Sequence, residues 1–345
     1  MPTNYIDVSV VIPNIDGSSL LGPCLNSLMD SAEDMSIEVI LVDNGSKDNS
    51  IDVAKSIFSD IIVVENDRNL GFATACNQGA AKANGRYVLL LNNDVILGKS
   101  MLRSLVQFAD CDVQAAMWQP TVKLPDGSLD TAGSFFTMSG FIRHRGWAQF
   151  NDRLLLTPSR VFSVKGACML LNRTALESVK GLDGSFFCYW EETDLAWRLQ
   201  LRGWEIRFVP ICCAEHKNGA TVSRILSDAD RNYLSFRNRF HAILRNSSIT
   251  TLIKVVPIHL ACCLVVALQF AIGRRRDCSL AVCRAIWWNL RHLNSLRRER
   301  SVVQGYRTVS DRVLFRDVSS RIPFVEAMGD LRKYVVAFKS QRPAG

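Results

Sequence analysis

Four short apolar runs divide the first hundred residues of the chain, and polar residues follow each run. The runs are nearly continuous and rich in β-branched side chains, as in VSVVIP and YVLLLN. Strands buried on both faces of a sheet have this pattern, because neither face alternates with solvent. The pattern predicts strands at residues 8–13, 38–43, 61–66 and 87–92.

Apolar residues between these runs recur every three or four positions. This period predicts helices across residues 20–28, 51–57 and 73–83. Strands that alternate with helices indicate an α/β fold with right-handed crossovers. Ligands bind beyond the carboxyl ends of such strands, so the polar residues there are the first candidates for chemistry.

The pattern from residue 110 to residue 230 is less regular. It predicts loop and edge strand up to about residue 160, with a strand near 115–119, then strands at 161–172 and 205–210 and helices at 174–179 and 194–201. We therefore expect one domain over residues 1–230, with a first half to about residue 110 and a second half from residue 111.

Charge separates a C-terminal region from this domain. Residues 1–230 hold 20 Lys and Arg against 27 Asp and Glu, whereas residues 231–345 hold 21 against 6, within a net charge of +8. A mildly acidic body with a basic tail indicates an anionic partner at one end, not nucleic acid over the whole surface. Residues 231–345 are therefore predicted to form a separate basic, helical region.

This basic region also contains a long apolar stretch. Val255 to Gly273 are 19 uncharged residues, close to the ~20 that span a bilayer. Pro257 interrupts the stretch, and basic residues on both flanks favour the cytoplasmic side for each flank. A later amphipathic pattern places on one face Ile286, Leu290, Leu293 and Leu296. We expect peripheral or monotopic attachment to the inner face of the cell membrane. The alternative is a helix pair buried against the first domain.

The cysteines and the first residues indicate a cytoplasmic protein. The 11 cysteines include no CxxC pair and lie mostly in apolar runs, where Cys behaves as a small hydrophobe. The opening MPTNYIDVSVVIP lacks the basic and apolar segments of a secretory signal. Reduced thiols in a reducing compartment are therefore expected.

Two polar clusters follow strands in the first half of the domain. Asp43 precedes Asn-Gly, which either presents the carboxylate to a base or ribose or simply forms a turn. Asn92, Asn93 and Asp94 follow a strongly hydrophobic strand. A carboxylate there can bind a hard divalent cation such as Mg²⁺ or Mn²⁺, and the alternative is a polar exit from the strand.

Two further clusters lie in the second half. Glu191, Glu192 and Asp194 follow the aromatic run FFCYW, which would desolvate a carboxylate and raise its pKa, as suits a general base. Asp194 is equally suited to cap the following helix, and the two glutamates to a solvated first turn. His216 follows the last strand, where it is either a metal ligand or a structural histidine.

Taken in order, these motifs resemble those of a known family. VDNGS, NLGFATACNQGAAKANGRYVLLLNND, VKGACMLLNR, GLDGSFFCYWEETDLAWRLQLRGW and IRFVPICCAEHKNGATVS are similar to segments of inverting family 2 glycosyltransferases, closest to their rhamnosyltransferase-like branch. The resemblance runs from about residue 8 to residue 246. It implies the GT-A fold, which is a Rossmann-like mixed sheet with flanking helices, and transfer of a sugar from a nucleotide donor.

The resemblance also implies residue roles. Nucleotide-sugar contacts would come from Pro13, Asp43, Asn69, Gly71, Phe72, Asn77, Asn92 and Asn93. Asp94 and His216 would hold Mg²⁺ or Mn²⁺, and the acceptor would be bordered by Gly166, Ala167 and Trp190. Glu192 would deprotonate the acceptor hydroxyl. The family usually has Asp at that position, so Glu191 and Asp194 remain alternatives. The family's usual Tyr-Asn pair after the first strand is replaced by Asn14-Ile15-Asp16.

The implied reaction is a single displacement that inverts the anomeric carbon. The branch implies dTDP-rhamnose as donor and a lipid-linked glycan as acceptor, with a UDP- or GDP-sugar as the alternative donor. A nucleotidyltransferase would need a Gly-rich phosphate loop after the first strand, and a dinucleotide oxidoreductase would need G-x-G-x-x-G at the same place. The chain has neither motif after its first strand. The remaining alternative is a membrane-associated relative without activity.

Overall fold

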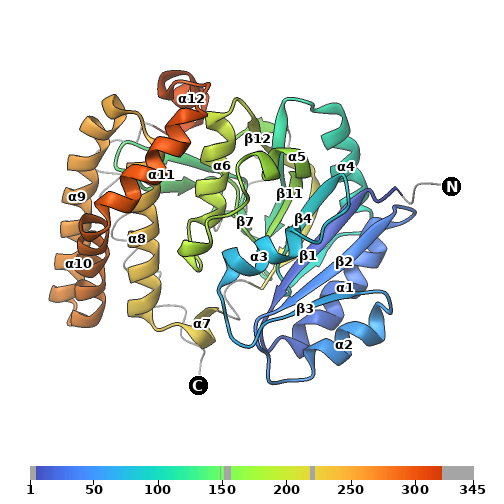
Figure 1. Ribbon diagram of the computed structural model, residues 1–345. Coiled ribbons are helices and arrows are strands. Elements are labelled where there is room, and N and C mark those ends of the chain that lie inside the picture. Colours follow the sequence, from blue (N-terminus) through green and yellow to red (C-terminus); the bar gives the residue numbers. More distant parts are fainter. Residues whose placement is uncertain (1–4, 148, 151–156, 218–221, 321–345) are drawn as a thin grey trace. The chain divides into compact units, whose positions relative to one another are not determined.

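The computed structural model describes residues 5–147, 149–150, 157–217 and 222–320 (Figure 1). The chain divides into two compact units. The first unit comprises residues up to 134, 144–187 and 191–218, and the second comprises 135–143, 188–190 and the residues from 219 onward. The predicted boundary at residue 230 falls inside a helix of the second unit, and residues 321–345 of the predicted C-terminal region lie outside the described residues.

A mixed sheet forms the centre of the first unit. Its strands are β1 (Val8–Asn14), β2 (Ile37–Asp43), β3 (Ile62–Glu65), β4 (Tyr87–Leu91), β5 (Val95–Leu97), β6 (Ala115–Lys123), β7 (Leu129–Thr131), β10 (Ser159–Arg160), β11 (Cys168–Asn172) and β12 (Glu205–His216). The spatial order is β10-β12-β6-β11-β4-β1-β2-β3, with β5 beside β12 and β7 beside β6. β1 to β4 are parallel, and β11 runs antiparallel to both β4 and β6.

Helices cover both faces of this sheet, as the alternation of elements predicts. They are α1 (Ser18–Ala32), α2 (Ser50–Ile57), α3 (Phe72–Ala80), α4 (Met101–Cys111), α5 (Arg173–Ser178) and α6 (Glu191–Leu201). On β1, Val10 and Ile12 pack into the core that α1, α2 and α4 share, whereas Val11 packs into the core of α3, α5 and α6. Burial on both faces explains why β1 and β4 are almost continuously apolar.

Several predicted elements differ in extent, and in three of them the difference changes the setting of a site residue. The strand predicted at 161–172 begins only at Cys168, so Gly166 and Ala167 lie in a turn. The last strand is longer than predicted and ends at His216. Helix α6 begins at Glu191, three residues before its predicted start, which places both glutamates in its first turn.

The second unit is mainly helical. Its helices are α7 (Val222–Ile225), α8 (Asp228–Asn246), α9 (Ile249–Ile272), α10 (Arg276–Arg291), α11 (Leu293–Gly305) and α12 (Asp311–Val318), beside a small sheet of β8 (Ser134–Thr137), β9 (Ile142–His144) and β13 (Ser319–Ser320). Figure 1 shows α8, α9 and α10 as neighbours, and their shared core contains Phe236, Val266 and Val282. The amphipathic stretch predicted as one helix is broken at His292, so Leu293 and Leu296 belong to α11 and not to α10.

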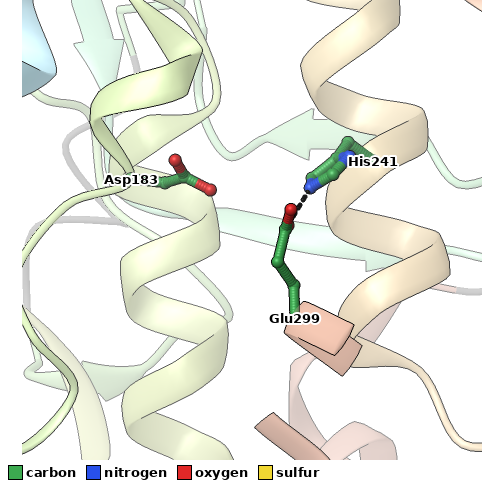
Figure 2. A group of neighbouring side chains, drawn as sticks. All are labelled: Asp183, His241 and Glu299. Carbon is green, nitrogen blue, oxygen red and sulfur yellow. Dashed lines mark hydrogen bonds and ion pairs between the residues drawn. The ribbon is translucent and has the colours of Figure 1, made fainter. Parts of the chain in front are cut away.

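Polar contacts attach α11 to α8. Figure 2 shows His241 on α8 beside Glu299 on α11, with Nε2 and Oε2 2.6 Å apart. Arg300 Nη1 donates to the carbonyls of Leu244 at 2.7 Å and Ser247 at 2.6 Å. The last carbonyls of a helix have no partner within the helix, so this arginine stabilises the end of α8.

Among the described helices, α9 alone is long and apolar enough to cross a membrane by length and composition. Its most apolar window has a mean hydropathy of 2.3, and 33% of that window is buried. Pro257 lies within the helix without ending it.

Candidate active site

Strand pairing brings Asp94 and His216 together. β5 follows Asp94 directly and runs antiparallel to the end of β12, with Val95 opposite His216. The backbone N–H of Lys217 donates to the Asp94 carbonyl at 3.1 Å. His216 Nε2 lies 3.4 Å from Asp94 Oδ1, and the two side chains are each only 5% exposed. The structure thus brings together the two residues predicted to bind metal.

These two side chains fit a divalent cation. Within the described chain, Asp94 Oδ1 is buried without a hydrogen-bond partner, and so is Asn92 Oδ1 two residues earlier. A buried acceptor without a donor is costly unless something positive satisfies it. A carboxylate oxygen facing an imidazole nitrogen, with an amide oxygen in the same segment, is a donor set suited to Mg²⁺ or Mn²⁺.

Asp130 joins this pair, although no motif in the sequence predicts it. The side chain is fully buried on β7. Its Oδ2 lies 2.9 Å from His216 Nδ1, and its Oδ1 forms an ion pair with Lys165 Nζ. The segment PDGSLDT resembles an ordinary turn, so only the pairing of β7 with β6 reveals the position of this carboxylate.

These contacts shift the pKa values of the group in opposite directions. Burial would raise the pKa of Asp130, but the hydrogen bond with His216 and the charge of Lys165 lower it to about 2. Burial opposes a charge on His216, yet the carboxylates of Asp130 and Asp94 raise the pKa of the imidazole above its ordinary value. Asp130 is therefore ionised near neutral pH and accepts from both neighbours.

Glu191 and Glu192 lie in the first turn of α6 with raised pKa values. Burial raises the pKa of Glu192 to about 7, although the charge of Lys165 partly offsets it. Burial and repulsion from Glu192 raise the pKa of Glu191 further. Glu191 is 6% exposed, whereas Glu192 is only half-buried. A Cβ built on Gly166 would lie 3.8 Å from Glu192 Cβ and 3.7 Å from Phe72 Cε1, so Glu192 faces the predicted acceptor and nucleotide residues.

Asp194 has a different environment from the two glutamates. Its carboxylate is fully buried and accepts from Arg198 Nε at 2.7 Å. Arg198 also donates to the carbonyls of Val179 at 2.7 Å and Gly181 at 2.8 Å. Asp194 is the fourth residue of α6, so its prediction as the cap of that helix is wrong. It holds Arg198, which joins α6 to the chain after α5, and this contact supports a structural role.

Asp43 and the asparagines around it form a closed polar network. The Asp43 carboxylate is 3% exposed and accepts from the backbone of Ser46 at 2.8 Å and from Asn14 Nδ2 at 3.1 Å. Asn93 Nδ2 donates to Asn14 Oδ1 at 2.7 Å. The structure therefore places Asp43 in a turn, and its contact with a nucleotide stays a prediction. Pro13, one residue before Asn14 on β1, keeps part of its surface exposed.

The other predicted nucleotide residues position the start of α3. Asn69 Oδ1 accepts from the backbone of Gly71 at 2.8 Å. Gly71 has φ +89°, and a Cβ there would approach Phe187 Cδ2 to 2.6 Å, so only glycine fits. Asn77 binds both backbone groups of Leu182, at 2.8 and 2.9 Å. These contacts give Asn69 and Asn77 structural partners.

The predicted acceptor residues fall into both units. Ala167 accepts a hydrogen bond at 2.9 Å from the backbone of Asn92, which places the turn at Gly166 beside the N-N-D segment of the first unit. Trp190 belongs to the second unit and is 6% exposed. The Arg239 guanidinium lies 5.4 Å from the centre of its ring. The ring is covered, which gives no support to its prediction as a sugar platform.

Comparison with known sequences points to one family. The family described as "Glycosyl transferase family 2" matches residues 9–179. An N-acetylglucosaminyl-diphospho-decaprenol L-rhamnosyltransferase of Mycobacterium tuberculosis is 27% identical over 240 residues, which cover 62% of this chain and 78% of the relative. The O-antigen biosynthesis protein RfbC of Myxococcus xanthus is 26% identical over 247 residues, or 67% of this chain and 19% of that protein.

Solved structures show the same fold. The mannosyltransferase PcManGT from Pyrobaculum calidifontis, in complex with GDP-Man and Mn²⁺, has a TM-score of 0.55 at 14% identity and covers 98% of this chain and 87% of its own. GalNAc-T7 with UDP, GalNAc and Mn²⁺ also has a TM-score of 0.55, at 19% identity, with 70% of this chain and 48% of that chain covered. The chain is a glycosyltransferase with the GT-A fold, and it belongs to glycosyltransferase family 2. The family and fold predicted from the sequence are confirmed.

Proposed function

We propose that this glycosyltransferase is a metal-dependent, inverting enzyme that moves a sugar from a nucleotide donor to a hydroxyl of a lipid-linked glycan. One line of contacts supports this proposal. The charge of Lys165 acts on Glu192, Lys165 pairs with Asp130, Asp130 binds His216, and His216 faces Asp94. A base and a cation site are thus linked through neighbouring side chains of one unit.

Glu192 acts as the general base in this proposal. Its carboxylate accepts the proton of the acceptor hydroxyl as the oxygen forms a bond to the anomeric carbon. The bond from that carbon to the donor diphosphate breaks on the opposite face, so the configuration inverts. A base with a pKa of about 7 is matched to proton transfer at neutral pH.

Asp94 and His216 are the residues that would hold Mg²⁺ or Mn²⁺. A divalent cation supplies neutralisation of the charge that develops on a diphosphate leaving group. Mn²⁺ in the structures of PcManGT and GalNAc-T7 supports this assignment. The Asp130 carboxylate stays behind His216 and outside the set of proposed ligands.

The names of the relatives support rhamnose and a lipid-linked acceptor. The mycobacterial relative is named as an L-rhamnosyltransferase that acts on N-acetylglucosaminyl-diphospho-decaprenol. We therefore propose dTDP-rhamnose as donor and a prenyl-diphosphate glycan as acceptor, in cell-surface polysaccharide synthesis. A UDP- or GDP-sugar is the alternative donor, since TarS of Staphylococcus aureus and PcManGT are solved with UDP-GlcNAc and GDP-Man.

The second unit is proposed to hold the enzyme on the cytoplasmic face of the membrane. Large apolar side chains remain exposed along α9, where Ile253 is 70%, Leu264 61%, Leu268 60% and Ile272 74% exposed. Their successive spacings of eleven, four and four residues keep them on one side of the helix. Trp287 on α10 is 63% exposed. An exposed apolar row of this length is typical of a membrane-facing helix.

Exposed basic residues accompany this apolar row. Arg274 lies between α9 and α10, Arg276 is the first residue of α10, and Lys254 lies near the start of α9. Basic side chains beside an apolar face favour the anionic lipids of a cytoplasmic leaflet. Monotopic attachment keeps both ends of α9 on the cytoplasmic side, and it keeps the covalently joined first unit at the surface where a lipid-linked acceptor lies.

Release of nucleoside diphosphate tests the enzymatic part of the proposal. The full chain is incubated with Mn²⁺, N-acetylglucosaminyl-diphospho-prenol and each of dTDP-rhamnose, UDP-GlcNAc and GDP-mannose. We expect acceptor-dependent release with dTDP-rhamnose, a product of inverted anomeric configuration by NMR, and no activity in Asp94→Ala. If only another donor releases its nucleoside diphosphate, the proposed sugar is wrong. If no donor does so, the proposal is contradicted.

A further inference from the structure

Asp130 makes two contacts at once from a position without access to solvent. β7 places it opposite β6, next to Thr131, which pairs with Val122. Its two oxygens bind different partners, His216 Nδ1 at 2.9 Å and the Lys165 ammonium. Gln119 supports the same arrangement, because its side chain accepts from the backbone of Lys165 at 3.0 Å and donates to Thr131 O at 3.2 Å.

The contact with His216 determines which ring nitrogen faces Asp94. A carboxylate can only accept, so the hydrogen bond to Asp130 requires a proton on His216 Nδ1. In the neutral imidazole, Nε2 then carries the lone pair, and Nε2 is the atom 3.4 Å from Asp94 Oδ1. Lys165 on the other oxygen keeps the carboxylate from rotating away and balances its charge.

We infer that Asp130 is the positioning residue of the metal site, which holds His216 in the Nδ1–H tautomer with Nε2 directed at the ion beside Asp94. The inference rests on the proposed metal site and goes beyond it, because Asp130 contacts the ring nitrogen of His216 that faces away from Asp94. Partners behind a histidine ligand fix its tautomer and orientation, and their removal typically weakens metal binding 10–100-fold.

Mn²⁺ titration of the full chain, followed by electron paramagnetic resonance of the free ion, tests this role. We expect Asp130→Asn to bind Mn²⁺ about 10–100-fold more weakly than the wild type. The matched control is Asp112→Asn, which removes a carboxylate 3.0 Å from Arg207 Nε in the same unit and should leave Mn²⁺ affinity unchanged. Because Asp130 acts through His216, the double variant Asp130→Asn/His216→Gln should bind no more weakly than His216→Gln alone.

The outcomes separate this inference from the proposed function. If the wild type binds no Mn²⁺, the metal site itself is wrong, and the inference falls with it. If the wild type binds Mn²⁺ and Asp130→Asn binds it equally well, the inference alone is overturned. The same holds if the losses of Mn²⁺ affinity from Asp130→Asn and His216→Gln multiply in the double variant.

A second measurement uses the wild-type protein and therefore does not depend on whether a variant of Asp130 folds. ¹⁵N-histidine NMR of the Mg²⁺-saturated wild type, with His216 identified by the resonance lost in His216→Gln, should show the proton on Nδ1. A proton on Nε2 overturns the inference.

Discussion

Three acidic side chains of the first unit, Asp130, Asp194 and Glu192, differ in their roles because different atoms surround them. Asp194 and Asp130 are both fully buried, and each forms an ion pair with a basic side chain, Arg198 and Lys165 respectively. Glu192 faces Gly166 and keeps partial exposure, and the charge of Lys165 offsets only part of the rise in pKa that burial causes. Its partial exposure beside Gly166 and its raised pKa support the proposal that Glu192 is the base.

Glu192→Gln should separate catalysis from donor binding. The amide keeps the shape of the side chain but cannot accept a proton, so turnover should fall by a factor on the order of 10²–10⁴. Donor binding, measured by the thermal shift that nucleoside diphosphate and Mn²⁺ produce, should persist. Glu191→Gln is the matched control and should keep most of its turnover. If Glu191→Gln loses activity and Glu192→Gln keeps it, the base is the neighbouring residue.

The pH dependence of kcat/KM should report the same group. A base that must be deprotonated gives a rate that rises with pH up to the pKa, so activity should increase tenfold per pH unit and level off near pH 7. Because the folded pKa is raised, the native state holds a proton that the unfolded chain has released. The free energy of unfolding should therefore fall as pH rises from the ordinary glutamate pKa to about 7. Glu192→Gln should abolish the rise of kcat/KM with pH. It should only weaken the pH dependence of the free energy of unfolding, because burial also raises the pKa of Glu191. An unchanged kcat/KM profile in that variant would exclude this assignment.

Arg198→Met should reveal the structural role of Asp194. The substitution leaves a fully buried carboxylate without its partner at 2.7 Å and two carbonyls without their donor. Removing one member of a buried ion pair typically costs about 3–5 kcal/mol, which urea unfolding would measure. Arg202→Met, at an exposed arginine of the same helix end, should cost far less. An equal loss of free energy of unfolding in the two variants would show that the buried ion pair contributes no more to stability than the exposed arginine.

Among single residues, the sequence identified those whose role follows from a motif. Asp94 and His216 were predicted as partners, and strand register places them 3.4 Å apart. Asp130 could not be predicted, because its partners lie 35 and 86 positions away in the chain. Asn77 was expected to face the nucleotide, but its position in the fold lets it bind Leu182, which no local pattern encodes.

Among elements, the spacing of hydrophobic residues predicted the strands and helices of the regular alternating part of the chain. β1, β2 and β4 and the helices between them lie where the pattern places them, because each contributes a fully buried apolar run. The strand predicted at 161–172 was too long, since apolar residues 161–164 are buried in turns and bridges instead of a ladder. Hydrophobicity therefore predicts burial here, and only the fold shows that the strand begins at Cys168.

The exposed apolar row of α9 leads to a test at the level of this element. Leu264→Glu/Leu268→Glu places two charges on a face that is already 61% and 60% exposed, so folding should change little while membrane affinity falls. Flotation of the full chain with vesicles of phosphatidylglycerol and phosphatidylethanolamine measures the effect, and we expect at least tenfold weaker binding. Val113→Glu, at an apolar residue that is 80% exposed in the first unit, is the control. Equal flotation of all three proteins would show that α9 does not meet lipid.

For the whole molecule, charge and hydrophobicity are concentrated in the same unit. Residues 231–345 carry 21 of the 41 basic residues and 6 of the 33 acidic ones, whereas the residues before them are mildly acidic. The sequence could reveal this separation because it depends on composition alone. It could not assign residues 135–143 and 188–190 to the second unit, since only the folded chain brings these segments to the C-terminal helices.

Salt dependence should separate the two components of membrane binding by the whole chain. Electrostatic attraction between the basic unit and anionic lipid is screened over about 8 Å at physiological ionic strength, whereas burial of apolar side chains is not. Binding to phosphatidylglycerol vesicles should therefore fall steeply between low and high salt and then reach a plateau above zero. Neutral phosphatidylcholine vesicles should show the plateau alone. Arg274→Glu/Arg276→Glu should flatten the salt dependence and leave the plateau, because these exposed arginines contribute charge and little apolar area. A full chain that fails to bind anionic vesicles at low salt would refute membrane attachment, and the helices of the second unit would then serve only the structure of the enzyme.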